Sequence, residues 1–171
     1  RSMPRHEIIS AFERLVAEGA PEVVLSGIHI GRYGSDLASR ETLGELVRDL
    51  LSRRHRTRIR LSSIEPREVT DELIAFLGQG LCRHLHIPLQ SGDDEILRSM
   101  RRNYSAGFYG DLVTSLARQV PGIAIGADVM VGFPGEEERH FNNTLRLVEE
   151  LPITHVHVFS YSPRPGTPAA A

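Results

Sequence analysis

Two hydrophobic periodicities alternate along this chain, and the alternation limits the folds that it can adopt. Short runs rich in β-branched residues predict strands, and the longer segments between them carry apolar residues at helical spacing and predict helices. We expect strands over 22–31, 58–64, 84–89, 123–133 and 154–162, and helices over 6–19, 42–55, 69–80, 93–102, 105–120 and 136–151. Five strands that alternate with helices indicate an α/β fold with a parallel sheet and helices outside it. An open doubly wound sheet and a full or partial β/α barrel both fit this order.

Composition excludes several classes of protein. The 171 residues are 40% hydrophobic and 25% charged, which is typical of a soluble globular domain. The net charge of −2 predicts no bulk attraction to nucleic acid, so any RNA contact would be local or supplied by another domain. The basic run from Ser52 to Arg60 could face RNA, but we favour its interpretation as a charged helix end. The single cysteine, Cys82, excludes a disulfide framework and any metal site built from several cysteines, and is interpreted as a small apolar filler.

The two ends of the sequence suggest a piece of a longer polypeptide. A β/α fold normally begins with a strand, but this chain opens on a helix, so we expect the first strand and its loop to be missing. Residues 163–171 are rich in proline and small residues, which is typical of a linker that leaves a domain. There is no apolar run long enough to cross a membrane and no signal-peptide stretch at the N-terminus. We expect no membrane contact and a cytoplasmic location.

Polar residues and glycines gather where each predicted strand ends. In parallel sheets the ligand lies at the carboxyl ends of the strands, so these residues are the candidate site. They follow the five strands in turn: Ser26, Gly27 and His29; Ser63 and Glu65; Gln90, Ser91 and Gly92; Asp128, Gly132, Phe133 and Pro134; Tyr161. No GxGxxG follows a strand and there is no P-loop, which argues against dinucleotide and NTPase sites.

Strand alternation places Asp128 and several histidines on the face opposite the valines and leucines. An unpaired Asp128 would cost several kcal/mol to bury, so it needs either a partner or a function. Ordinary structural roles stay open for the others. Gln90, Ser91 and Gly92 could cap the next helix, Glu65 could be a solvated loop carboxylate, and the histidines could be hydrogen-bonded core residues.

Several motifs in order resemble one family. The segments "VVLSGIHIGRYG", "RIRLSSIEP", "HLHIPLQSG", "MRRNY", "IGADVMVGFPGE" and "HVFSYSPRPGTPAA" are similar to those of the radical S-adenosylmethionine (SAM) methylthiotransferases. Within that family the chain most resembles the branch that acts on N6-threonylcarbamoyladenosine at position 37 of tRNA. The resemblance covers nearly all 171 residues. It implies a partial (β/α)6 TIM-type barrel and a transferase that uses SAM and [4Fe–4S] clusters.

The resemblance also implies parts that this sequence lacks. Members of the family hold one cluster with a CxxxCxxC motif, take sulfur from a second cluster in an N-terminal domain, and bind tRNA with the help of a C-terminal TRAM domain. They also need a reducing protein partner. Since the chain has no CxxxCxxC, we expect residues 1–162 to be a truncated radical SAM core, with 163–171 leading toward a TRAM domain. No residue of the chain is expected to be catalytic or to bind a metal, and the chain alone is expected to be inactive.

The resemblance implies a role for each candidate residue. Gln90 and Ser91 would contact the ribose of SAM, and Arg102 would pair with its carboxylate. Ser26, Gly27 and His29 occupy the segment that would take the methionine amino group through backbone carbonyls. The adenine would lie against Gly132, Phe133 and Pro134. The remaining residues would line the barrel mouth near SAM or the adenine substrate: Ser63, Glu65, His86, Asp128 and Tyr161.

Two other functions fit some of these residues. A metal-dependent barrel hydrolase could use His84, His86, His157 and Asp128 as a zinc site, together with His155. Three protein ligands and an open position for water would suffice for such an enzyme. A non-catalytic module that binds RNA or protein through a barrel scaffold is the other alternative.

Overall fold

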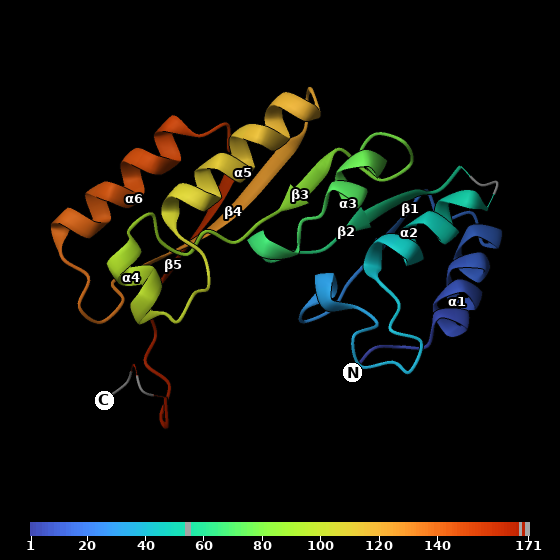
Figure 1. The fold of residues 1–171 in the computed structure, drawn as a ribbon, viewed down its shortest axis with the longest axis horizontal. Helices are drawn as coiled ribbons and strands as arrows, with labels where there is room; N and C mark the ends of the chain where they lie inside the picture. The colour runs from blue at the N-terminus through green and yellow to red at the C-terminus, as the bar shows by residue number, and fades with distance from the viewer. Residues whose placement is uncertain (54–55, 168, 170–171) are drawn as a thin grey trace. The chain divides into compact units, whose positions relative to one another are not determined.

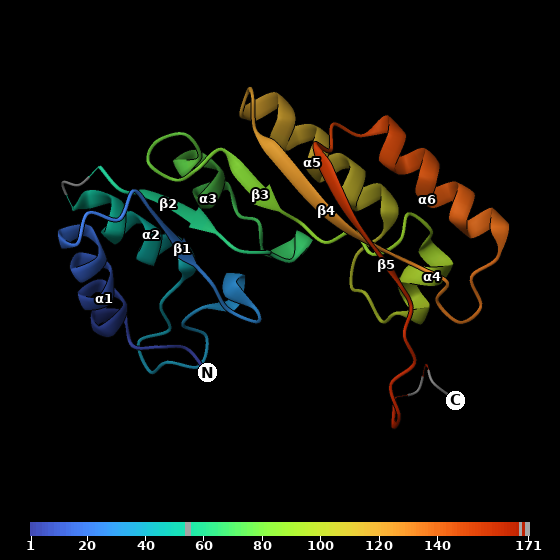
Figure 2. The ribbon, with the colours of Figure 1, turned by 180° about the vertical axis from the view of Figure 1, so that it is seen from behind.

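A computed structural model describes residues 1–53, 56–167 and 169 of the chain (Figures 1 and 2). The chain divides into two compact units, residues 1–86 and 87–171, and each is described here by itself. Within the described ranges, no helix is long and apolar enough to cross a membrane.

The first unit alternates helices with short parallel strands. Its strands β1 and β2 pair in parallel, with Val23 opposite Ile59. The elements follow in the order α1 (Arg5–Ala17), β1 (Glu22–Leu25), η1 (Ile30–Arg32), α2 (Leu43–Ser52), β2 (Arg58–Leu61), η2 (Pro66–Glu68), α3 (Asp71–Phe76) and β3 (His84–His86). The helix α2 packs a fully buried stripe, including Val47 and Leu50, and Ile59 of β2 is equally buried. The core of this unit therefore has contributions from both α2 and β2.

Two helix starts in this unit follow directly from the sequence. Thr42 caps α2 by accepting a hydrogen bond from the backbone of Glu45, whose carboxylate accepts one from the Thr42 backbone in return. Thr70 caps α3 by accepting from the backbone of Leu73. Both caps satisfy backbone donors that a helix start leaves unpaired. Thr42 and Thr70 are therefore the N-caps of α2 and α3.

The second unit is built on the parallel pair β4 (Ala124–Val131) and β5 (His155–Ser160). Its helices are α4 (Asp94–Ser99), α5 (Ala106–Gln119) and α6 (Glu138–Glu150). Figures 1 and 2 show α5 and α6 on one side of β4 and β5. The opposite face of β5 is uncovered by any helix among the described residues of this unit, and the side chains on that face are exposed.

An extended segment over 87–90 runs beside β4 in the same unit. The amide of Ile87 donates to the carbonyl of Gly126, and the amide of Leu89 donates to that of Asp128. The buried hydroxyl of Tyr109, on α5, donates to the carbonyl of Ile87 at 2.8 Å. Tyr104 donates to the carbonyl of Leu89 at 3.0 Å. Since both its amides and its carbonyls are bonded, this segment is held firmly up to Gln90.

The expected α/β order with parallel strands is confirmed, but several elements are shorter than predicted. Strand β1 ends at Leu25, because its last ladder bond is from the amide of Ser62 to the Leu25 carbonyl, and the chain then turns toward η1. The predicted helix over 93–102 ends at Ser99, and Arg101 adopts a left-handed conformation. In the predicted helix over 42–55, α2 ends at Ser52, and residues 54–55 lie outside the described part of the chain.

Candidate functional site

In the first unit, a cavity of about 660 Å³ opens at the carboxyl end of β1. Ser26, Gly27 and His29 line it, as expected for residues that follow a strand of a parallel sheet. Apolar side chains form much of the remaining wall, including Phe12 of α1 and Val24 of β1. The volume lies in the range that small-molecule cofactors occupy.

The cavity wall has an acidic neighbour that the sequence did not reveal. Nδ1 of His29 lies 3.9 Å from Oε1 of Glu68, in η2. Burial raises the pKa of the Glu68 carboxyl, opposed by the nearby His29. A Cβ atom on Gly31 would lie 2.3 Å from Cβ of Glu68. Because Gly31 has no side chain, the Glu68 carboxyl can approach the loop after β1. In the sequence, the glycine in "HIGRYG" was the only sign of this close approach.

Two further candidates of this unit stand apart from the cavity lining. Ser63 is exposed and Glu65 is half-buried at the start of η2, and neither lines the cavity. The Glu65 carbonyl accepts a hydrogen bond from the amide of Glu68. Their role near a ligand stays a prediction.

In the second unit, Gln90 sits at an irregularity beside β4. The amides of both Leu89 and Gln90 donate to the single carbonyl of Asp128, at 3.1 and 2.7 Å. Gln90 has a φ of +66°, in the left-handed region that non-glycine residues rarely adopt. Two residues opposite one is the pattern of a β-bulge, which redirects a side chain and is common near active sites. Gln90 is half-buried, and the backbone conformation at the bulge fixes the direction in which its side chain leaves the strand.

The hydroxyl of Ser91 is engaged inside the protein. It is fully buried, lies 3.2 Å from Oγ1 of Thr144 in α6, and accepts a hydrogen bond from the amide of Asp93. Asp93 caps α4 by accepting from the backbone of Glu95 and Ile96. Asp93 therefore caps α4, in place of Gln90, Ser91 or Gly92. Ser91 instead connects this turn to α6.

Arg102 follows the end of α4, as the sequence placed it. Arg101 before it has a φ of +57°, and the backbone amide of Arg102 donates to the carbonyl of Leu97. The side chain of Arg102 is half-buried. This closing turn fixes where the Arg102 side chain leaves the backbone.

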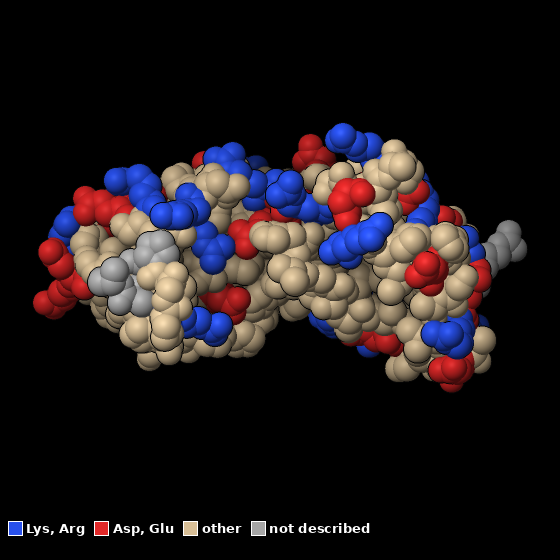
Figure 3. All heavy atoms as spheres, turned by 90° about the horizontal axis from the view of Figure 1, so that it is seen from below, with Lys and Arg blue, Asp and Glu red and all other residues tan. Residues whose placement is uncertain are grey.

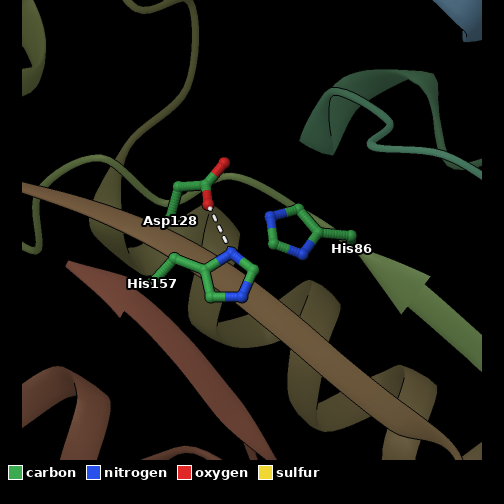
Figure 4. A group of neighbouring side chains, drawn as sticks. All are labelled: His86, Asp128 and His157. Atoms are coloured by element: carbon green, nitrogen blue, oxygen red, sulfur yellow. Dashed lines mark ion pairs between the residues drawn. The ribbon is translucent and has the colours of Figure 1, made fainter. Parts of the chain in front are cut away.

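Asp128 has the partner that its position requires. It lies directly opposite His157 in the β4–β5 register, and its Oδ1 is 3.5 Å from Nδ1 of His157 (Figure 4). The Asp128 side chain is mostly buried, while that of His157 is 59% exposed. An acidic and an imidazole group thus meet on the face of the sheet that the helices leave uncovered.

The carboxyl end of β4 carries the glycine-rich turn "GFPGE". Gly132 has a φ of +75° and its amide donates to the carboxylate of Glu136, which closes the turn. The ring of Phe133 meets that of Tyr161 edge to face, with centroids 5.4 Å apart. The Tyr161 hydroxyl donates to the carbonyl of Ala169. Phe133 and Tyr161 are therefore brought together, with the exposed Pro134 beside Phe133 in the turn.

A second group of acidic and imidazole side chains in this unit is structural. Asp93, Glu95 and His140 lie close enough to share a metal ion. However, Asp93 caps α4 and accepts from Asn143, while Glu95 pairs with both Arg139 and His140. These bonds account for the cluster without a metal.

Three described arginines of the basic run, Arg53, Arg58 and Arg60, are paired. Arg53 bridges to Glu13 and Asp49, while Arg58 and Arg60 both bond to Glu22. On the face shown in Figure 3, basic and acidic side chains are interspersed. This agrees with the interpretation of the run as a charged helix end, whose residues 54–55 lie outside the described residues.

Cys82 does not fit an iron–sulfur cluster. Its thiol donates to the carboxylate of Glu22 across 3.5 Å, and burial raises its pKa above the ordinary value. A four-iron cluster needs several cysteine thiolates, and the sequence contains this one cysteine. The interpretation of Cys82 as an apolar filler was incomplete, because the thiol belongs to a polar network.

Comparison with known families identifies the fold. The Radical SAM superfamily matches residues 1–148. The threonylcarbamoyladenosine tRNA methylthiotransferase MtaB of Bacillus subtilis is 43% identical over 99% of this chain and 38% of its own length. The tRNA-2-methylthio-N(6)-dimethylallyladenosine synthase of Thermobifida fusca is 42% identical over 96% of the chain and 34% of its own length. The chain thus spans between a third and two fifths of these relatives.

Solved structures with the same fold are more distant in sequence. The radical SAM methyltransferase TsrM of Kitasatospora setae, solved with cobalamin and a [4Fe–4S] cluster, superposes with a TM-score of 0.77 at 19% identity. The superposition covers 98% of this chain and 30% of the TsrM chain. Coproporphyrinogen III oxidase of Escherichia coli gives a TM-score of 0.65 at 21% identity, over 94% of this chain and 38% of that one.

These matches confirm the predicted TIM-type α/β fold and leave the hydrolase alternative unsupported. Radical SAM enzymes use SAM together with a [4Fe–4S] cluster, as the resemblance of the motifs implied. With the family profile matching 148 of its 171 residues, this chain belongs to the Radical SAM superfamily.

Proposed function

We propose that this chain is the SAM-binding core of a tRNA methylthiotransferase that modifies N6-threonylcarbamoyladenosine at position 37. The observation that carries the proposal is the 43% identity, over 99% of the chain, to a relative named for that activity. The reaction would take place in the cytoplasm, with tRNA and a reducing protein as partners. A relative named for the dimethylallyladenosine reaction is nearly as similar, at 42%. The methylthiotransferase class is therefore better supported than the nucleoside.

Polar groups of each unit, considered by itself, have the chemistry that parts of SAM require. In the first unit, the cavity beside Ser26, Gly27 and His29 has the volume of a cofactor site, and backbone carbonyls there would receive the methionine ammonium. In the second unit, the amide of Gln90 would bond the ribose hydroxyls. Arg102 would pair with the carboxylate, since a guanidinium presents two parallel donors to it.

Other residues would shape the surroundings of the adenine and the substrate. Gly132, Phe133 and Pro134 would lie against the adenine of SAM, and Tyr161 would hold Phe133 by the edge-to-face contact. Ser63, Glu65, His86 and Asp128 would line the approach to the reacting nucleoside. When bound with its cluster, SAM supplies a 5′-deoxyadenosyl radical. The cysteines for that cluster do not come from these 171 residues.

The proposal is tested with the complete polypeptide that contains this chain. The protein is reconstituted anaerobically with iron and sulfide and given SAM, a reductant and tRNA that carries threonylcarbamoyl- or dimethylallyladenosine. Mass spectrometry of the digested tRNA should show a methylthio group on the threonylcarbamoyl nucleoside. Methylthiolation of the dimethylallyl nucleoside alone would reassign the branch, and no methylthiolation of either would overturn the proposal.

Removal of Arg102 tests the assignment of SAM binding to the chain. We expect Arg102→Ala to weaken SAM binding by roughly ten- to a hundredfold, the usual effect of losing a hydrogen-bonded charge pair. The matched control is Arg98→Ala, which removes an exposed arginine from the last turn of α4. Equilibrium dialysis with labelled SAM measures both. If both variants weaken SAM binding equally, Arg102 does not contact SAM.

A further inference from the structure

Gln90 lies at the centre of a strained three-residue turn. The amide of Ser91 donates to the carbonyl of Leu89 at 2.9 Å, and Gln90 between them has a φ of +66°. This combination is the rare form of the γ-turn, because a positive φ is unfavourable for residues other than glycine. A backbone strained in this way persists only where the surrounding structure fixes it. The contacts on either side of Gln90 therefore decide whether its side chain keeps its direction.

Strand β4 fixes the entry to the turn. The amide of Gln90 donates to the carbonyl of Asp128 at 2.7 Å, and the amide of Met130 donates to the carbonyl of Gln90 at 2.9 Å. Neither bond involves Ser91 or Gly92, which follow Gln90. The exit from the turn therefore depends on a different element.

A single hydroxyl on α6 holds the exit from the turn. Oγ1 of Thr144 accepts from the amide of Gly92 at 2.9 Å, lies 3.2 Å from the hydroxyl of Ser91, and donates to the carbonyl of His140 at 3.1 Å. A threonine hydroxyl has one proton and two acceptor sites. All three partners are satisfied only when that proton goes to His140 and Ser91 donates to Thr144. Because Thr144 is 4% exposed and Ser91 is fully buried, water has little access to replace these bonds.

The neighbouring contacts between α6 and the start of α4 do not use this hydroxyl. Nδ2 of Asn143 donates to Oδ2 of Asp93 at 2.7 Å, and Nε2 of His140 lies 3.1 Å from the carboxylate of Glu95. Loss of the Thr144 hydroxyl would therefore leave α4 attached to α6 and would release mainly the turn that precedes it.

We infer that Thr144 is a positioning residue for SAM binding. Its hydroxyl holds Ser91 and Gly92 in place, and this keeps Gln90 in the strained conformation that directs its side chain to the cofactor. Since Thr144 is buried, it acts through Gln90 and not by contact with SAM. The inference rests on the proposed function, because it takes SAM as the ligand of Gln90. It goes further by naming a residue of α6 on which that contact depends.

Substitution of Thr144 in the complete polypeptide tests the inference. We expect Thr144→Val, which keeps the shape of the side chain, to weaken SAM binding by about fivefold, the usual effect of one side-chain hydrogen bond. Thr144→Ser, which keeps the hydroxyl, should restore binding. The matched control is Thr57→Val, which removes a similarly buried hydroxyl that donates to the carbonyl of Ala20 in the first unit. Both valine variants should unfold at lower urea, but equilibrium dialysis should show weaker SAM binding for Thr144→Val alone.

A double variant separates positioning from an independent effect. Gln90→Gly alone should weaken SAM binding by about fivefold. Thr144→Val should add little in that background, because the contact that it supports is already lost. An independent contribution of Thr144 would weaken binding by the same factor in both backgrounds. Additive effects would therefore overturn the inference, as would an unchanged SAM affinity in Thr144→Val.

Hydrogen exchange in the wild type gives a test that does not depend on the folding of a variant. Because coupling between two sites is reciprocal, bound SAM should slow exchange of the Gly92 amide. The comparison is the amide of Thr154, which bonds to the carbonyl of Ile125 near the start of β4. We expect a larger slowing at Gly92 than at Thr154. Equal slowing at the two amides would overturn the inference.

The outcomes distinguish this inference from the proposed function. An unchanged SAM affinity in Thr144→Val, in an enzyme that methylthiolates tRNA, would overturn the inference alone. A loss of affinity that passes through Gln90, without methylthiolation by the complete enzyme, would support the inference and overturn the function. No SAM binding by the wild type would overturn both.

Discussion

At the scale of single residues, the Glu22 carboxylate in the first unit accepts hydrogen bonds from several side chains. It starts β1, directly opposite Arg58, and accepts hydrogen bonds from Arg60 at 2.7 and 3.2 Å. The thiol of Cys82 donates to the same group. The hydrogen bond from Arg60 is the main reason that the pKa of Glu22 is lowered to about 2. The pairing of β1 with β2 is thus joined to an ionised side chain.

Glu22→Gln should lower stability in a pH-dependent way. Because the folded-state pKa lies below the ordinary 4.5, the ionised group stabilises the fold above about pH 4.5, and this contribution is lost as the pH falls toward 2. We expect a loss of about 1 kcal/mol at pH 7, typical of an ion pair that is not fully buried. Urea unfolding at pH 7 and at pH 3 measures it. A difference between wild type and variant that does not shrink at pH 3 would contradict this account.

Gln90 shows why a residue can be found in the sequence while its conformation cannot. The motif "PLQSG" pointed to a polar turn after a strand, but the bulge depends on both amides sharing the Asp128 carbonyl. That bond joins residues far apart in the chain, so local periodicity carries no sign of it. The positive φ of Gln90 is a consequence of this long-range bond.

Gln90→Gly should separate stability from ligand binding. Glycine adopts the left-handed conformation without strain, so the variant should unfold at the wild-type urea concentration or slightly above it. SAM affinity should fall by about fivefold, since one side-chain hydrogen bond is lost. Calorimetric titration with SAM and urea unfolding provide the two measurements. Unchanged SAM affinity would show that the Gln90 amide does not contact the cofactor.

At the scale of secondary-structure elements, the turn before α4 is joined to α6 through a glycine. A Cβ atom on Gly92 would lie 2.6 Å from Cα of Thr144 and 3.2 Å from Cβ of Leu147. The amide of Gly92 donates to Oγ1 of Thr144 at 2.9 Å, and Ser91 contacts the same oxygen. The backbone of the turn therefore packs directly on the helix, and α6 sets the position of the neighbouring Gln90.

Gly92→Ala should destabilise the second unit by about 1–3 kcal/mol, because the added methyl group meets backbone rather than a side chain that can move. The control is Gly107→Ala in the first turn of α5, where a Cβ would make only an ordinary contact of 4.0 Å with Oγ of Ser105. That change should leave stability equal or raise it by up to about 1 kcal/mol through helix propensity. Urea midpoints compare the two. A Gly92→Ala protein as stable as the wild type would show that α6 can move away from the turn.

The elements themselves were largely predictable, because periodicity and capping residues are local signals. Single threonines cap α2 and α3, and Gly19, shortly after the end of α1, has a φ of +82°. The partners of the polar residues were not predictable. Glu68 beside His29 and Thr144 beside Ser91 are brought near by packing between elements, and sequence spacing does not encode such contacts.

At the scale of the whole molecule, the sequence holds the scaffold of a radical SAM enzyme with one cysteine. The motifs at the strand ends were recognisable because they follow one another in a fixed order along the chain. The cluster was excluded on chemistry alone, since four irons need several thiolates. Cys82 is further removed from this role by its bond to Glu22 and its raised pKa.

The 171-residue chain should therefore hold no [4Fe–4S] cluster and start no radical. After anaerobic incubation with iron and sulfide and desalting, we expect no stoichiometric iron on the protein and no 5′-deoxyadenosine from SAM and dithionite. Cys82→Ser should give the same background, because a single thiolate does not retain the cluster. SAM binding measured on the same sample shows that the fold is intact. Four irons per chain together with formation of 5′-deoxyadenosine would contradict the expectation that this chain cannot hold the cluster. Such a result would require cluster ligands other than cysteine.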